Sequence, residues 1–549
     1  MRTPIPQQFI EIISGNNGLK LYLDSLLENR DFTTRSWLYS GKKGSTYVKA
    51  NKVLKDWLAR LSVLKDGSEF EKKVYQFDIS QIEKYGPQGG HAPVEDLLDD
   101  IVMPSFNPPQ WSRKPAAFTT KAWKWAIEMV ISELRNAGVH DLYPRSYKHV
   151  VDDMRARDTL ISNSGWPDFT TRSKPEVVAK AISDAQDGSW RQYPAILLFR
   201  RYNGKTRQVW MFPMATNIVE GSWFQPLTDA IMKSSLADYF FSPWKGFDTV
   251  RSRVSDVYRL EDQCYIAASD FSSTDAHFQL AASEEVLKVL TALFKPQYKK
   301  ELEESVRHMH TIPLLIGPKD MLTGKHGVAS GSNWTNFIET IFDMIFGYYV
   351  QYEISNMDES FWVTPEYAIG DDMAWKVERD GNDAIPLEVM AKQFPQELER
   401  LGRSAGQQIK AEKTMSEIDE VKSLQRLFQR GYTVPDSDEV RAVYSTVRAL
   451  KSSIYPERAH YQDWDLDMFA ARQFMILENC VDHPLFEEFV AFICKGNPYL
   501  IPFAKKSDSK LDGITRKSKR IPGLNPTYNQ EKRDTGLSQF ASIRIARGL

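Results

Sequence analysis

The chain has 549 residues, with 70 Lys and Arg against 72 Asp and Glu, so its formal net charge is −2. This length is too great for one simple core, and we expect several subdomains or one large multi-lobed protein. Hydrophobic residues make up 42%, the usual share in a soluble globular protein. The near-zero charge does not exclude a nucleic-acid enzyme, because a positive channel can lie inside a neutral shell.

Cysteine content and hydropathy argue against several other classes of protein. Cys264, Cys480 and Cys494 lie far apart, which argues against a disulfide framework or a zinc module and favours a reducing compartment. The first residues lack the pattern of a secretory signal, and no stretch reaches the roughly 18 apolar residues that span a bilayer. We therefore expect a soluble protein without membrane contact, either intracellular or enclosed in a particle.

The first hundred residues mix helical and loop patterns. Residues 47–64 have the periodicity of a helix, and a stretch rich in glycine and proline follows at 85–90. The acidic run at 95–100 can in principle bind a metal ion. No partner ligands lie nearby in the sequence, so we predict a solvated helix face instead.

A basic hairpin is predicted next. Residues 193–199 have the pattern of a buried strand, Asn203-Gly204 is a hairpin signal, and a second strand follows at 208–212. Lys205 and Arg207 are spaced to point the same way along this strand. Two such cations suit a triphosphate, and the alternative is a routine surface hairpin.

Residues 265–271 are predicted to form a strand that ends at Asp270, and Asp275 follows five residues later. Further along, His308 and His310 are two residues apart. Because the histidines have no matching acidic context, we predict that they lie on a surface helix rather than in a metal site.

Small residues then precede an apolar helix. Residues 327–336 form a loop of Gly, Ala, Ser and Asn that leads into a helix predicted for 335–349. Such a loop lets the backbone approach a ligand closely, and its polar side chains can donate hydrogen bonds at a helix N-terminus. The alternative is an ordinary capped helix.

Two short apolar strands flank Gly370-Asp371-Asp372, which predicts a hairpin whose tip presents adjacent carboxylates. If this tip lies beside Asp270, the carboxylates can bridge two hard cations. Two ions about 4 Å apart can activate an attacking hydroxyl and stabilise a departing pyrophosphate. Asp275 lies where it can contact a sugar hydroxyl.

In this order the residues resemble the motifs of viral RNA-dependent RNA polymerases, over residues 160–430. The resemblance is greatest to the small double-stranded RNA viruses, with picobirnaviruses first and partitiviruses second. The matches are Asp270 and Asp275 (motif A), Ser330, Gly331 and Thr335 (B), Gly370-Asp371-Asp372 (C), Lys413 (D), 423–428 (E), Lys205 and Arg207 (F), and Ser162, Gly165 and Pro167 (G).

The resemblance implies an α+β right-hand polymerase with an encircled active site. The N-terminal extension would bridge fingers and thumb. The implied ranges are 1–95 for the extension, 96–260 and 280–325 for the fingers, 261–279 and 326–431 for the palm, and 432–549 for the thumb with a basic C-terminal tail.

The resemblance also implies template-directed incorporation of NTPs by two-metal-ion transfer, with Mg²⁺ or Mn²⁺ held by Asp270, Asp371 and Asp372. Lys413 would protonate the pyrophosphate. The implied substrate-binding residues are Lys205, Arg207, Asp275, Ser330, Gly331, Asn333 and Thr335, and the implied template-binding residues are Ser162, Gly165 and Pro167.

One position departs from the family pattern. Many members have Asn four residues after the motif B threonine, where it helps to recognise the ribose, and this chain has Glu339. Ribose discrimination would then depend more on Asp275, Ser330 and Asn333.

The implied partners are template and nascent RNA, NTPs and a viral capsid protein. The enzyme would be a monomer in the virion interior and the host cytoplasm. A reverse transcriptase is an alternative, although such enzymes usually have an aromatic residue before the paired aspartates and a bulky side chain that blocks the 2′-hydroxyl. A two-metal nuclease or phosphatase and a non-enzymatic RNA-binding shell protein are the others.

The last 45 residues, 505–549, carry 11 Lys and Arg against four Asp and Glu, about seven net positive charges. We predict a poorly packed basic tail, either disordered or in contact with RNA or with the enzyme's own active site.

Overall fold

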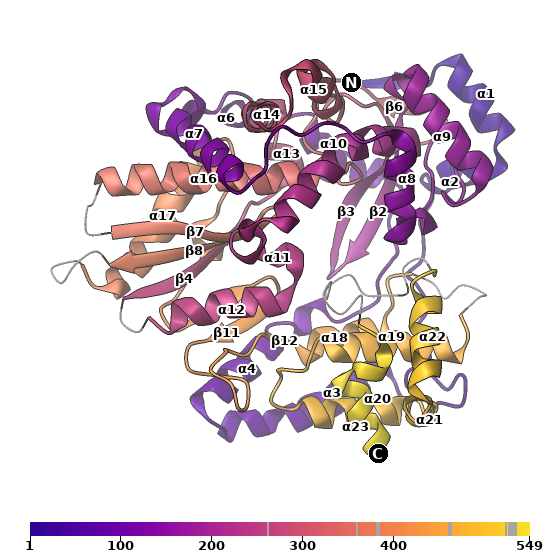
Figure 1. Ribbon diagram of the computed structural model, residues 1–549. Coiled ribbons are helices and arrows are strands. Elements are labelled where there is room, and N and C mark those ends of the chain that lie inside the picture. Colours follow the sequence, from indigo (N-terminus) through magenta and orange to yellow (C-terminus); the bar gives the residue numbers. More distant parts are fainter. Residues whose placement is uncertain (261–262, 358–360, 380–384, 459–463, 522–523, 525–534) are drawn as a thin grey trace.

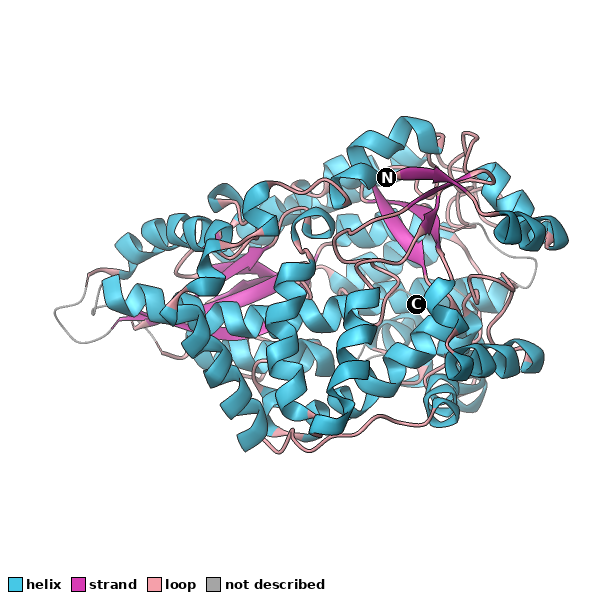
Figure 2. Cartoon of the chain, turned by 90° about the horizontal axis from the view of Figure 1, so that it is seen from above, coloured by secondary structure: helices cyan, strands magenta, loops and turns pink. Residues whose placement is uncertain are grey.

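The computed structural model describes residues 1–260, 263–357, 361–379, 385–458, 464–521, 524 and 535–549. Its helices surround three small sheets, which confirms the predicted α+β class (Figures 1 and 2). Within these ranges every helix is too short or too polar to cross a lipid bilayer.

A four-stranded antiparallel sheet lies at the left of Figure 1, with the strand order β7-β8-β4-β9. Helix α16 packs on this sheet so closely that a side chain at Gly347 would come within 2.6 Å of Pro365. The predicted strand at 265–271 and the predicted hairpin are both present. The strands are β7 (Phe361–Ile369), β8 (Asp372–Arg379), β4 (Cys264–Asp270) and β9 (Met415–Ser416).

A second sheet has the order β1-β6-β5-β2-β3. Its β2–β3 hairpin turns at Asn203 and Gly204, whose φ angles of +55° and +74° suit a tight two-residue turn, as predicted. The N-terminal residues pair with β6 at its edge. The strands are β1 (Arg2–Pro4), β2 (Ala195–Tyr202), β3 (Lys205–Met211), β5 (Leu314–Leu315) and β6 (Asp320–Leu322).

Helices cover these two sheets and share one large apolar core with them, to which Trp123, Phe342 and Trp375 contribute. The helices are α1 (Gln7–Gly15), α2 (Asn17–Ser25), α5 (Val94–Leu97), α6 (Gln110–Arg113), α7 (Lys121–Asn136), α8 (Tyr147–Ala156), α9 (Pro175–Asp187), α10 (Met214–Lys233), α11 (Ser242–Lys245), α12 (Phe247–Tyr258), α13 (Thr274–His277), α14 (Leu280–Leu293), α15 (Lys299–His308), α16 (Trp334–Met357) and α17 (Leu387–Ser404).

The C-terminal helices form a separate core at the bottom of Figure 1, together with α3 and α4 from the N-terminal segment. Trp57 and Phe77 pack in this core, whereas Phe9 and Leu19 pack in the large one. Residues 1–95 therefore contribute to both cores. The helices are α3 (Ala50–Leu61), α4 (Glu69–Ile79), α18 (Thr446–Ile454), α19 (Leu466–Glu478), α20 (Phe486–Gly496), α21 (Leu500–Ala504), α22 (Asp508–Ser518) and α23 (Ala541–Gly548).

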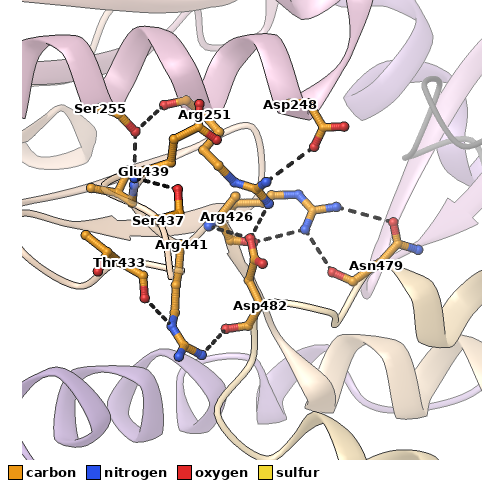
Figure 3. Close-up of polar contacts among 12 residues, drawn as sticks. Asp248, Arg251, Ser255, Arg426, Thr433, Ser437, Glu439, Arg441, Asn479 and Asp482 are labelled. Carbon is orange, nitrogen blue, oxygen red and sulfur yellow. Dashed lines mark hydrogen bonds and ion pairs between the residues drawn. The ribbon is translucent and has the colours of Figure 1, made fainter. Parts of the chain in front are cut away.

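Buried polar contacts join this C-terminal unit to the rest of the chain (Figure 3). Arg426 donates to the carbonyl oxygen of Asn479 at 2.8 Å. Asp482 pairs with Arg251 of α12 and accepts from the backbone N–H of Ala442. The third sheet lies at this junction, in the order β10 (Glu420–Ser423), β11 (Arg426–Gln429) and β12 (Val443–Tyr444).

The predicted poorly packed tail is wrong for the described part of 505–549. Leu511, Phe540 and Ile543 are buried in the C-terminal core, and the hydroxyl of Ser542 donates to Glu478 at 2.7 Å. The segment packs despite its net positive charge, because its apolar residues are spaced to form a buried helix face. Residues 522–523 and 525–534 lie outside the described part.

The prediction that His308 and His310 lie on a surface is also wrong. His310 is fully buried, with Nδ1 2.9 Å from the carbonyl oxygen of His326 and Nε2 2.7 Å from the Ser283 hydroxyl. His308 packs edge-on against Trp190. The carboxylates at 95–100, in contrast, are exposed as predicted.

Candidate active site

Three aspartates meet at one end of the four-stranded sheet. Asp270, the last residue of β4, pairs directly with Asp372, the first residue of β8. Asp371 lies in the turn, and its carbonyl oxygen accepts from the backbone N–H of Phe271 at 3.2 Å. Two stretches a hundred residues apart are thus brought together, as the sequence predicts.

Helix α16 holds this turn in place. Gly370 has φ +60°, a conformation that favours glycine at the first position of a two-residue turn. Its N–H donates to the Thr340 hydroxyl at 2.9 Å. The hydroxyl of Thr274 donates to the carboxylate of Asp371 at 3.1 Å. Both ends of the carboxylate-bearing turn are therefore held by threonines.

The pKa values of Asp371 and Asp372 are raised. Asp372 is exposed, and partial desolvation by the neighbouring protein, with repulsion from Asp371 and Asp270, raises its pKa. Desolvation also raises the pKa of Asp371, against the hydrogen bond from Thr274. Because the protein disfavours these charges, cations would bind here favourably.

Two further acidic side chains lie behind the turn on α16. Glu339 and Asp343 are buried, and burial raises both pKa values well above normal, with Asp371 adding repulsion. A side chain at Gly370 would lie 2.8 Å from the amide nitrogen of Asn336 and 3.4 Å from a Glu339 oxygen. Glu339, which departs from the family pattern, is thus buried beneath the Gly370 turn.

The predicted metal site stays a prediction. In the chain as described, no three Asp, Glu, His or Cys side chains are close enough together to hold a metal ion. The donor set of carboxylate oxygens nevertheless has the hard chemistry that Mg²⁺ and Mn²⁺ prefer.

The predicted hairpin cations, Lys205 and Arg207, are both exposed on β3. The charge of Arg207 lowers the pKa values of Asp275, Asp371 and Asp372, so its guanidinium lies near the aspartates. Burial raises the pKa of Asp275 itself to about 6.

The small-residue loop at 327–336 packs against the end of β3. A side chain at Gly331 would lie 1.6 Å from the carbonyl oxygen of Trp210, so only glycine fits. Ser330 is exposed, whereas the Asn333 amide donates to the carbonyl oxygen of Asn217 at 3.0 Å. The buried hydroxyl of Thr335 donates to the carbonyl oxygen of Ala329.

Comparison with known proteins identifies the class of enzyme. A family model described as viral RNA-dependent RNA polymerase matches residues 202–452. A curated protein of Human picobirnavirus (strain Human/Thailand/Hy005102/-), "Potential RNA-dependent RNA polymerase", is 26% identical over 503 residues, covering 88% of this chain and 85% of that protein. The chain is similar to viral RNA-dependent RNA polymerases, in the segment 202–452 and along most of its length. It is thus an RNA-directed RNA polymerase, and enzymes of this family generally use divalent metal ions.

Solved structures agree with this fold. The crystal structure of the RNA-dependent RNA polymerase of a human picobirnavirus matches over the full length of both chains with a TM-score of 0.77 and 21% identity. An insertion loop deletion mutant of the same enzyme matches with a TM-score of 0.76, also at 21% identity. The right-hand polymerase architecture predicted from the sequence is consistent with these matches.

The polymerase holds the predicted template residues in a compact loop. Ser162 is exposed, and Gly165 is buried with φ +66°. A side chain at Gly165 would come within 2.6 Å of the carbonyl oxygen of Phe212. The carbonyl oxygen of Pro167 lies 3.4 Å from the amide nitrogen of Asn16, which donates to it. The loop is therefore tied to the N-terminal helices.

Lys413 is exposed and precedes β9, which pairs with β4 through Met415 and Ala268. This register places Lys413 at the end of the sheet that carries Asp270. Of the predicted residues, Asp270, Asp371, Asp372 and Lys413 thus share one end of the four-stranded sheet. Lys205 and Arg207 lie on β3 of the second sheet, and the template residues lie on a separate loop.

Sequence reasoning missed a group of cations opposite the hairpin tip. Lys451 and Arg448 are buried on α18, and among the described residues neither has a carboxylate within ion-pair distance. Lys451 donates to the Asn203 side chain. Burial, then repulsion from Arg448 and Lys84, lowers the pKa of Lys451 to about 7. The only signal was a pair of cations three residues apart on an apolar helix face.

Proposed function

We propose that this polymerase joins nucleotides by two-metal-ion transfer, with Asp270 and Asp371 as the principal ligands and Asp372 assisting. The observation that carries the proposal is the pairing of Asp270 with Asp372 at the sheet end, with Asp371 in the adjoining turn. Two bound Mg²⁺ or Mn²⁺ ions would activate the 3′-hydroxyl and neutralise the departing pyrophosphate.

The hairpin cations are proposed to bind the triphosphate. Arg207, near the aspartates, would hold the phosphates next to the reacting centre, and Lys205 would assist from the same face of β3. Lys413 would donate a proton to the pyrophosphate from the adjacent sheet end.

Asp275, Ser330, Gly331, Asn333 and Thr335 are proposed to bind the incoming nucleotide, and ribose selection is proposed to depend on Asp275, Ser330 and Asn333. Ser330 is exposed and free to contact a nucleotide directly, and Asp275 lies near Arg207 and Asp371. The side-chain amide of Asn333 and the hydroxyl of Thr335 donate to backbone carbonyls, so these two residues would act by shaping the loop.

Template RNA and nascent RNA are proposed as partners of the enzyme. Ser162, Gly165 and Pro167 would hold the template. Arg448 and Lys451 donate to the side chains of Gln425 and Asn203 but have no carboxylate within ion-pair distance among the described residues. Their positive charge would attract RNA phosphates to this part of the enzyme.

The domain ranges remain those implied by the sequence: an extension at 1–95, fingers at 96–260 and 280–325, a palm at 261–279 and 326–431, and a thumb at 432–549. Support comes from the packing of residues 1–95 in both apolar cores. We further propose a monomer that works in the virion interior and the host cytoplasm with a capsid protein as partner, in keeping with the viral family.

The test is incubation with a single-stranded RNA template, four NTPs and Mg²⁺. We expect full-length complementary RNA, and dNTPs in place of NTPs should yield far less. Asp371→Asn should lower synthesis by about 10³-fold or more, because it removes a metal ligand. RNA binding should be retained in a filter assay.

Asp152→Asn is the matched control, since Asp152 is an exposed carboxylate on α8. It should synthesise RNA normally. Undiminished synthesis by Asp371→Asn would refute the metal assignment, and degradation of the template without incorporation would point to a nuclease.

A further inference from the structure

Buried polar side chains of α10 connect two loops of the proposed site. The template loop is defined here as residues 162–172, and the serine loop as residues 327–336. Asn217, on the first turn of α10, accepts from Arg172 at 2.8 Å and donates to the carbonyl oxygen of Gly331 at 3.2 Å. It also accepts, through its backbone oxygen, from Asn333. Asn217 thus contacts both loops at once.

Glu220 fixes the serine loop one helical turn further along. It accepts from the Ser332 hydroxyl at 2.5 Å, from the Asn333 N–H at 2.9 Å and from the Asn217 amide at 3.0 Å. Burial raises the pKa of Glu220 to about 7, and these three donors and the charge of Arg172 oppose the shift. All three donors satisfy a carboxylate that is 1% exposed.

Arg172 completes the connection on the template side. Its Nε donates to the carbonyl oxygen of Asn163 at 2.9 Å, beside the exposed Ser162. Both loops also pack against the same short segment at the end of β3. Gly165 lies against Phe212, and Gly331 lies against Trp210. Ser162 of the template loop and Ser330 of the serine loop, both exposed, are therefore held at a fixed separation.

We propose that Arg172, Asn217 and Glu220 are positioning residues that keep the template loop and the serine loop in register, so that the template base stays aligned with the incoming nucleotide. This rests on the proposed function of the two loops. Stability alone does not explain a buried carboxylate and a guanidinium between the two loops. Well-packed apolar side chains in their place would usually stabilise the folded protein as well or better. Their value here is the directional link, which an apolar contact would not give.

A double-mutant cycle tests the link. Arg172→Met breaks it on the template side and Ser332→Ala on the serine side, and the two residues are connected through Asn217 and Glu220. Each change should lower kcat/KM for NTP by about 10-fold, mainly through KM, and the double variant also by about 10-fold instead of 100-fold. Misincorporation should rise in all three variants.

Ser222→Ala is the matched control. Ser222 is also buried, but its hydroxyl donates only within α10, to Val219. Alone it should leave kcat/KM unchanged, and combined with Arg172→Met it should add nothing. Thermal unfolding identifies variants that fail to fold, and Arg172→Lys, which keeps the cation, then replaces Arg172→Met with the same expected non-additivity.

Hydrogen exchange measures the link without activity. Arg172→Met should speed amide exchange in residues 329–335 by about 10-fold, because Asn217 and Glu220, the latter being the acceptor of the Asn333 N–H, are then held less firmly. Ser222→Ala should not change it. Additive losses in the cycle together with unchanged exchange would overturn the proposal. If the wild type makes no RNA, the proposed function fails, whereas the exchange result still decides whether the loops are linked.

Discussion

Two aspartates of this polymerase are equally buried but differ in their hydrogen bonds. Asp78, in the C-terminal core, accepts from the Ser445 and Thr446 hydroxyls, the Val447 N–H and the His483 ring. Asp343, behind the Gly370 turn, is equally buried, and neither of its oxygens has a hydrogen-bond partner among the described residues.

The difference separates structural carboxylates from functional ones. A carboxylate with four donors stabilises the fold that surrounds it. A buried carboxyl without donors costs stability, so its retention calls for another reason. Asp343 lies behind the turn that carries the proposed metal ligands and is repelled by Asp371 and Asp372, and this gives such a reason.

The largest expected effect is on stability, at Asp78. Asp78→Ala should lower the free energy of unfolding by about 4 kcal/mol, because four buried donors lose their acceptor. Urea denaturation measures the change. RNA synthesis per folded molecule should stay at the wild-type level, since Asp78 is remote from the aspartates of β4 and β8. A decrease in the free energy of unfolding of less than about 1 kcal/mol would contradict the structural role that distinguishes Asp78 from Asp343.

His310 extends the contrast to a buried group that stays neutral. Burial lowers its pKa to about 4, and the Ser283 hydroxyl and the His326 carbonyl oxygen suit the neutral ring. Between pH 6.5 and 4 only the unfolded chain takes up the proton. The contribution of His310 to the free energy of unfolding should therefore decrease as the pH is lowered, by about 1.4 kcal/mol per pH unit and about 3 kcal/mol in all.

Unfolding curves across this pH range measure the slope for His310. His310→Asn should reduce it, whereas the same change at the exposed His149 should not. An unchanged slope in His310→Asn would show that other groups determine the acid sensitivity.

The sequence predicted what depends on neighbours along the chain. A strand that ends at Asp270 and a turn at Gly370 are local patterns, and the motif order implied their meeting. Lys451 and Asp343 were missed because their surroundings come from distant segments, the hairpin tip in one case and the Asp371 turn in the other.

The two wrong predictions have the same origin. The tail was judged by its charge, but Phe540 and Ile543 find an apolar partner surface only in the folded C-terminal core. The histidines were judged by the absence of acidic neighbours, but His310 is buried by Ser283 and His326 from other elements.

A smaller effect is expected where α16 holds the Gly370 turn. Thr340→Val keeps the shape but leaves the Gly370 N–H without its acceptor. Synthesis should fall by about 10-fold, chiefly in kcat, because the aspartates lose their fixed position. Thr340→Ser, which restores the hydroxyl, should recover most of it. Equal rates in the valine and serine variants would exclude this positioning role.

The smallest effect, at Asp343, decides the comparison. Asp343→Asn removes an ionisable group near the proposed cations, so the Mg²⁺ concentration for half-maximal synthesis should rise by about 3-fold. The free energy of unfolding should stay level or increase by about 1 kcal/mol, because no hydrogen bond to the carboxylate is lost. Magnesium titration and urea denaturation of one preparation give both numbers. If Asp343→Asn destabilised the protein as Asp78→Ala does, the missing donors would have to come from ordered water, and the proposed electrostatic role would be unnecessary.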